Sequence, residues 1–174
     1  DTPIPRSECF GFGTPDQSWP ALMREQLINM IHTREADICV DSACTDLFNE
    51  YKDVLAKVFS RLNKVRLWSR EDILTENALT TFMTCFHNSK ELTNLSVYST
   101  VSVENQIHIL LRYPNKEKIT SIEMTTTAYA TTIKDYDAVF QQYMSNVGDS
   151  YPNVESLQIY GPMGPIDYTL DLHL

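Results

Sequence analysis

Apolar residues recur along this chain in groups of three, and the same spacing appears four times. In each group the second apolar residue follows the first by three positions, and the third follows the second by two. The groups are Leu62, Val65 and Leu67; Leu92, Leu95 and Val97; Ile119, Ile122 and Met124; and Val154, Leu157 and Ile159. Residues two apart point to one face of a strand, so we expect the last two of each group to share an interior. The groups start 30, 27 and 35 residues apart, a period typical of stacked repeats.

Segments with helical spacing alternate with these groups. They predict helices over about residues 19–33, 44–61, 71–87 and 134–147. Period-two alternation predicts strands over about 63–68, 92–100 and 119–127, within 151–162, and over 167–174. The first apolar residue of each group is expected to pack at the turn that enters its strand. A helix then covers the buried face of the strand and returns the chain to begin the next unit.

Residues 105–113 fit two kinds of element. Ile107, Leu110 and Leu111 suit a short helix, whereas Ile107, Ile109, Leu111 and Tyr113 suit a strand. A helix is compatible with an α/β fold of parallel strands. A strand would make residues 92–127 a three-stranded antiparallel meander, and the chain an α+β fold with an antiparallel sheet packed on helices. The sequence leaves both alternatives open.

The four groups match the motif L-x-x-L-x-L, and residues 60–162 thereby resemble leucine-rich repeats of the long, irregular, ribonuclease-inhibitor-like type, which also occur after F-box motifs. The resemblance implies an α/β fold built as a short array of strands and helices. At the family's usual Asn or Cys ladder position this chain has Arg70, Thr100, Thr127 and Pro162. We therefore expect a single domain over 1–174, with a loop and a two-helix cap over 1–61 and the strand/helix array over 62–174.

Composition and charge narrow the class of partner. The 174 residues are 43% hydrophobic and 21% charged, as in globular domains, and the net charge is −9. An acidic chain has no electrostatic attraction for nucleic-acid phosphates or for an anionic membrane surface. No apolar run approaches the roughly 18–20 residues that a membrane-spanning helix needs. We expect neither nucleic acid nor a membrane as partner.

The cysteine count bears on the compartment. Cys9, Cys39, Cys44 and Cys85 are an even set, compatible with disulfide bonds and secretion, and four cysteines allow three pairings. The first residue, Asp1, fits either a mature product whose signal peptide has been removed or a piece cut from a longer chain. The alternative is that all four are buried thiols in a cytoplasmic repeat fragment.

Catalytic and metal-binding motifs are missing from the sequence. Its histidines do not pair at the i, i+4 spacing of a zinc helix, and there is no nucleophile elbow, phosphate loop or dinucleotide fingerprint. Asp37, Asp41 and Asp46 lie close together, but their spacing differs from that of a calcium loop. We therefore expect a protein that is not an enzyme and has no cofactor or metal.

The candidate binding surface is the outward side of the predicted strands. If the strands stack in parallel, the alternate residues form two rows. One row is Arg66, Ser96, Glu123 and Gln158, and the other is Trp68, Tyr98, Thr125 and Tyr160. Aromatic side chains with polar tips beside an arginine are favoured at protein interfaces. They are also common in strands for packing reasons alone.

The sequence thus favours a secreted, non-enzymatic protein-binding module that uses this sheet face. The alternative is a small secreted virulence effector of a fungus or parasite with an α+β fold, acting on a host protein.

Overall fold

The computed structural model describes residues 34–69, 71, 73–99, 102–126, 133–161 and 167–171. Its strands are β1 (Glu35–Cys39), β2 (Lys64–Ser69), β3 (Asn94–Ser99), β4 (Ser121–Thr126), β5 (Ser156–Tyr160) and β6 (Asp167–Asp171). Its helices are α2 (Thr45–Glu50), α3 (Lys52–Phe59), α4 (Glu76–Thr84), α5 (Val103–Arg112) and α6 (Ile133–Asn146). Short 3-10 turns occupy Ser42–Cys44, Lys116–Lys118 and Gly148–Ser150.

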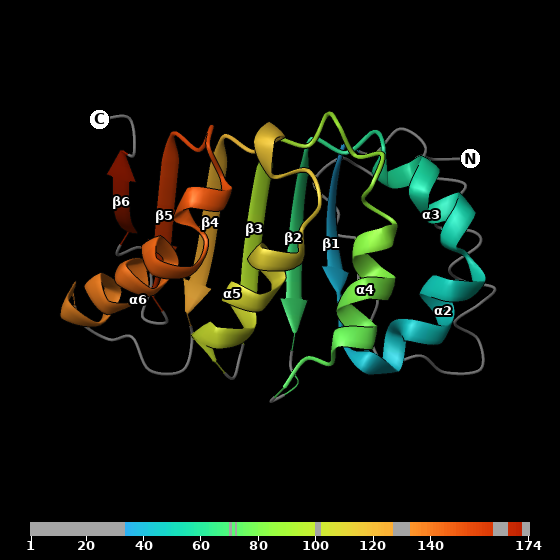
Figure 1. The fold of residues 1–174 in the computed structure, drawn as a ribbon, viewed down its shortest axis with the longest axis horizontal. Helices are drawn as coiled ribbons and strands as arrows, with labels where there is room; N and C mark the ends of the chain where they lie inside the picture. Colours follow the sequence, from blue (N-terminus) through green and yellow to red (C-terminus); the bar gives the residue numbers. More distant parts are fainter. Residues whose placement is uncertain are drawn as a thin grey trace.

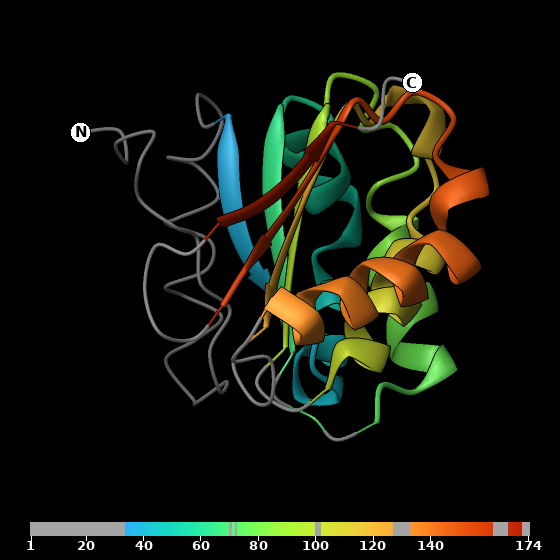
Figure 2. The ribbon, with the colours of Figure 1, turned by 90° about the vertical axis from the view of Figure 1, so that its left-hand side faces the viewer.

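The strands form one sheet in the order in which they occur in the chain. β1 to β5 are parallel, and β6 joins β5 antiparallel at the end of the sheet. The labelled helices all lie on one face (Figures 1 and 2), as expected when successive parallel crossovers have the same hand and advance in the same direction. The predicted α/β class is confirmed. The antiparallel meander over 92–127 is wrong, because β3 and β4 are parallel and residues 105–112 belong to helix α5.

The register of the sheet is the one that the repeated spacing predicts. Val65 pairs with Leu95, Leu95 with Ile122, and Ile122 with Leu157, and the third residues of the groups align in the same way. All eight of these side chains are at most 1% exposed. The first residues of the groups are buried too, so each group fills the space between the sheet and the helices.

Backbone hydrogen bonds repeat at the strand entries. The carbonyl just before one strand accepts two N–H groups from the start of the next strand. The acceptors and donors are Arg34 with Asn63 and Lys64, Asn63 with Thr93 and Asn94, Thr93 with Thr120 and Ser121, and Thr120 with Glu155 and Ser156, all at 2.8–3.3 Å. The same connection therefore occurs at four successive steps, from β1 to β5, although the loops between the strands differ in length.

Aromatic rings connect the helical layer from one unit to the next. Phe59, at the end of α3, stacks on Phe86 with ring centroids 4.7 Å apart, and Phe86 contacts Tyr113 at 5.9 Å. Phe48 meets Phe82 edge-on at 4.5 Å. The rings lie in a single core that runs along the described sheet and helices. Such pairs add about 0.5–1.5 kcal/mol each beyond the apolar area they bury.

The beginning of the array differs from the prediction. β1 occupies Glu35–Cys39, where the sequence predicted only a link between two helices. Its inward residues Ala36 and Ile38 continue the buried rows, but the position three before Ala36 is Thr33, so the repeated spacing is broken there. The array therefore starts at β1 rather than at residue 62. The predicted helix over 19–33 lies outside the described residues.

The predicted helix over 44–61 is two helices. α2 ends at Glu50 and α3 starts at Lys52, with Tyr51 at φ −105° and ψ 15° between them. Both belong to the crossover from β1 to β2, so residues 44–61 are part of the array and not of a terminal cap. The predicted helix over 71–87 is the shorter α4, whose N-cap is Thr75, with Oγ1 accepting a hydrogen bond from the Ala78 N–H.

Candidate functional site: the sheet face opposite the helices

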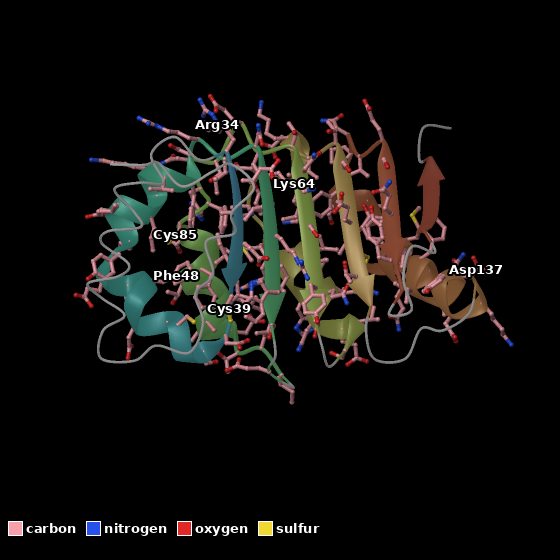
Figure 3. All side chains as sticks on the ribbon, turned by 180° about the vertical axis from the view of Figure 1, so that it is seen from behind. Arg34, Cys39, Phe48, Lys64, Cys85 and Asp137 are labelled. Atoms are coloured by element: carbon pink, nitrogen blue, oxygen red, sulfur yellow. The ribbon has the colours of Figure 1, made fainter. Side chains whose placement is uncertain are left out.

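Four neighbouring parallel strands bring the predicted site residues together. Arg66 pairs with Ser96, Ser96 with Glu123, and Glu123 with Gln158, which forms the first predicted row. The second row is Trp68, Tyr98, Thr125 and Tyr160. Both rows lie on the sheet face that is opposite the helices, which is seen in Figure 3. We refer to these eight residues as the sheet-face rows.

The side chains of the rows differ in exposure. Ser96 is buried, at 4% exposure, and the other seven residues are partly exposed. Trp68 is partly buried and packs against the hydrophobic core, so it contributes to stability as well as to the surface. Trp68 is therefore held in place by the core while part of it remains accessible.

Arg66 is held over the ring of Tyr98. Its Cζ atom lies 4.7 Å from the ring centroid, within the range of a cation–π interaction. Its Nη1 lies 3.9 Å from Oδ2 of Asp37, which is an ion pair but is longer than a hydrogen bond. The Nε atom of Arg66 is buried and has no hydrogen-bond partner. The ring of Tyr98, and not a set of hydrogen bonds, fixes the position of this guanidinium.

A second ion pair crosses the sheet. Nζ of Lys64, on β2, lies 3.7 Å from Oε1 of Glu123, on β4. The two side chains reach each other across β3, which is consistent with the burial of Ser96 between them. At the other end of the rows, the Tyr160 hydroxyl donates to Oε1 of Gln158 at 2.6 Å.

β1 extends both rows by one residue that the sequence did not assign to the site. Asp37 pairs with Arg66 in the register, and Cys39 pairs with Trp68. They were missed because β1 itself was missed. The alternation of Ala36 and Ile38 with the polar residues around them was the signal that could have indicated this strand.

A polar network closes the carboxyl ends of β1 and β2. The Ser69 hydroxyl donates to Oδ1 of Asp41 at 2.9 Å and accepts from the Glu71 N–H at 3.2 Å. The Glu71 carboxylate accepts from the backbone N–H and the hydroxyl of Ser42, at 2.9 and 3.0 Å. Nδ2 of the buried Asn105, on α5, donates to the Glu71 carbonyl at 2.6 Å. These bonds satisfy loop backbone groups, which is a structural role.

Gln106 makes a similar link two strands further on, at β4. Its Nε2 donates to the Thr125 carbonyl at 3.0 Å, and its Oε1 is buried without a hydrogen-bond partner. Together with Asn105 it ties α5 to the loop after β2 and to β4. The four ladder positions that the sequence compared with the leucine-rich repeat family, Arg70, Thr100, Thr127 and Pro162, lie outside the described residues.

Three of the four cysteines are described, and all three are buried thiols. Burial raises the pKa of the Cys85 thiol from 9 to about 11. The pKa of Cys39 is raised too, first because its thiol is hydrogen-bonded with Cys44 and then because it is buried. Such thiols are poor nucleophiles at neutral pH. Cys9 lies outside the described residues, so a disulfide bond that involves it stays a prediction.

The helix face offers an open groove between α4 and α5. Its lining is Thr80, Met83, Thr84, His87, Leu111 and Arg112. Arg112 is engaged by Glu76 at 2.7 Å and by Thr80 at 3.1 Å. In the part of the chain that the structure describes, no three His, Cys, Asp or Glu residues are placed to hold a metal ion, and none of the helices is long and apolar enough to span a bilayer.

Comparisons with protein-family models, with curated proteins and with solved structures found no match to this chain.

Proposed function

We propose that this chain is a non-enzymatic module that binds a protein partner through the sheet-face rows. One observation carries the proposal: Arg66, Trp68, Tyr98 and Tyr160 align on one face of a parallel sheet and are all partly exposed. Arginine, tryptophan and tyrosine are the residues that most often dominate binding energy in protein interfaces.

The arrangement of the rows on the sheet favours binding of a macromolecule over catalysis. Successive parallel strands place equivalent residues about 4.8 Å apart, which gives a continuous set of side chains supported by the backbone of the sheet. A surface of this kind suits a macromolecule, whereas a small substrate needs a concave pocket with a few converging polar groups. The core beneath the rows is apolar and fully buried, so binding can use the face without disturbing the fold.

We also propose that the array is a short leucine-rich-repeat-like solenoid of the long, irregular type. The proposal is supported by the parallel strands in chain order, the helices on one face, and the repeated pairs of hydrogen bonds at the strand entries. In such arrays each unit contacts mainly its neighbours, and the sheet face forms a continuous binding surface.

The test of binding compares two double variants. Trp68→Ala with Tyr98→Ala removes two aromatic groups of the rows, and Val54→Ala with Leu111→Ala removes two exposed apolar groups on the helices. A partner is first identified by affinity capture with the full chain, and its affinity for each purified variant is then measured by calorimetry. We expect the first variant to bind at least tenfold more weakly and the second to bind as the unaltered chain does.

Circular dichroism and thermal unfolding serve as the fold control, because Trp68 also packs against the core. Tyr98→Ala alone keeps the test informative if the double variant unfolds. Equal affinity of a folded Trp68 and Tyr98 double variant would refute the proposal.

We propose, further, that the chain is secreted. The support is the even number of cysteines in the sequence, which is compatible with disulfide bonds. Cys39, Cys44 and Cys85 are free thiols that lie beyond bonding distance of one another. A non-reducing peptide map of protein isolated from its natural source checks this. We expect a peptide in which two cysteines are linked, whereas four alkylatable thiols would contradict secretion.

A further inference from the structure

We propose that Arg66 binds a carboxylate side chain of the protein partner, so that the rows recognise an acidic segment. This inference rests on the proposed function, because it names the chemistry that the same surface takes. It is based on the position, exposure and hydrogen bonding of the guanidinium and on the charges around it.

The Arg66 guanidinium is oriented but has unused hydrogen-bonding capacity. Tyr98 holds it from one side at 4.7 Å, and the side chain is 43% exposed. The Asp37 carboxylate lies 3.9 Å from Nη1, too far for a hydrogen bond. The Nε donor also has no partner, but it is buried and out of reach of an incoming group. A guanidinium has five N–H donors in a planar fork that matches a carboxylate. Its exposed end is therefore free to form a bidentate pair with an incoming carboxylate.

The cations of this face lie further out than their acidic partners. The exposed fraction is 43% for Arg66 against 16% for Asp37, and 37% for Lys64 against 25% for Glu123. Lys64 and Arg66 are two positions apart on β2 and share one side of the sheet. Although the whole chain carries a net charge of −9, this strand presents positive groups to an approaching partner.

A single negative charge fits this surface better than a double one. Asp37 and Glu123 lie beside the two cations, so the four charges sum to zero. A dianionic phosphate would be repelled by the two carboxylates at short range, because like charges in a partly buried site disfavour each other. A monoanionic carboxylate adds one charge and can pair with Arg66. We therefore assign a carboxylate of Asp or Glu to this position.

The residues next to Arg66 indicate which type of residue should flank the acidic residue of the partner. Trp68 follows on the same strand, and Tyr98 lies opposite Trp68 in the register. Both rings are partly exposed, so an apolar or aromatic residue next to the acidic one can bury its side chain against them. The expected ligand is an acidic residue with an apolar neighbour.

A random peptide library displayed on phage and selected against the immobilised full chain tests this inference. We expect the selected peptides to be enriched in Asp or Glu beside an apolar residue. One such peptide is then made in its Glu and Gln forms and titrated into the unaltered chain and into Arg66→Gln. Each single change should weaken binding about tenfold, and the two together should cost little more than one.

Two further variants and one modified peptide sharpen the result. Arg66→Lys should recover only part of the affinity, because a lysine cannot form the planar bidentate pair. Arg112→Gln, on the helix face, is the charge-matched control and should bind normally. A phosphoserine form of the peptide should bind no more tightly than the Glu form.

The outcomes separate this inference from the proposed function. Peptides that lose affinity with Trp68→Ala and Tyr98→Ala but bind equally well as Glu and Gln forms would overturn the carboxylate and leave the binding surface standing. A preference for phosphoserine would overturn it as well. Peptides that are insensitive to Arg66, Trp68 and Tyr98 alike, or a selection with no binders, would count against both.

Discussion

At the scale of single residues, three buried tyrosines near the end of α5 have unequal environments. The Tyr151 hydroxyl donates to the Leu110 carbonyl at 2.6 Å. This carbonyl is in the last turn of α5, where helical carbonyls lack partners within the helix. The hydroxyls of Tyr113 and Tyr143 are buried and have no hydrogen-bond partner. Of these three hydroxyls, only that of Tyr151 contributes a hydrogen bond to the folded state.

The difference predicts opposite effects of removing one oxygen atom. Tyr151→Phe should lower the free energy of unfolding by about 1 kcal/mol, because a buried carbonyl loses its donor. Tyr143→Phe should leave stability unchanged or raise it, since the buried hydroxyl that it removes is unsatisfied. Urea unfolding followed by circular dichroism measures both. An equal loss in the two variants would show that the Tyr143 hydroxyl has a partner, such as an ordered water.

At the scale of the elements, the sequence was sufficient wherever an inward-facing pattern was complete. β2 to β5 were found because each has two buried residues two apart and a third at the strand entry. β1 was missed because its inward residues are Ala36 and Ile38 and its entry position is a threonine. Residues 105–113 could not be assigned because their apolar residues suit both periods, and the Ser102 cap on the Asn105 N–H settles the helix only in three dimensions.

The candidate site was predictable to the same degree. The rows follow directly from parallel stacking of equal units, so their membership could be given before the fold was known. The contacts within them could not. The reach of Lys64 to Glu123 and the position of Arg66 over Tyr98 depend on side-chain conformations that no spacing encodes. Asn105 and Gln106 are polar by sequence and buried in the fold, because each bonds backbone carbonyls across the array.

At the scale of the whole molecule, buried thiol and tyrosine hydroxyl groups make the stability of the fold decrease at alkaline pH. Burial raises the pKa of Cys85 from 9 to about 11, and it raises the pKa values of Tyr113, Tyr143 and Tyr151 above 10. Between the two pKa values of each group, the unfolded chain has lost the proton and the folded chain keeps it. The unfolded state then binds fewer protons, so stability falls as pH rises.

We therefore expect full stability below about pH 9, a first decline that begins at pH 9 and comes from Cys39 and Cys85, and a steeper one above pH 10 from the tyrosines. Urea midpoints measured from pH 8 upward test this. Cys85→Ala should lower stability at pH 8, because it leaves a small cavity, and should make the decline between pH 9 and 10 shallower. The decline that remains in this range comes from Cys39, whose pKa is also raised, since the tyrosine contribution begins only above pH 10. A midpoint that stays constant to pH 11 would mean that these hydroxyl and thiol groups reach water in the folded state, and the close packing of the helices on the sheet would then be wrong.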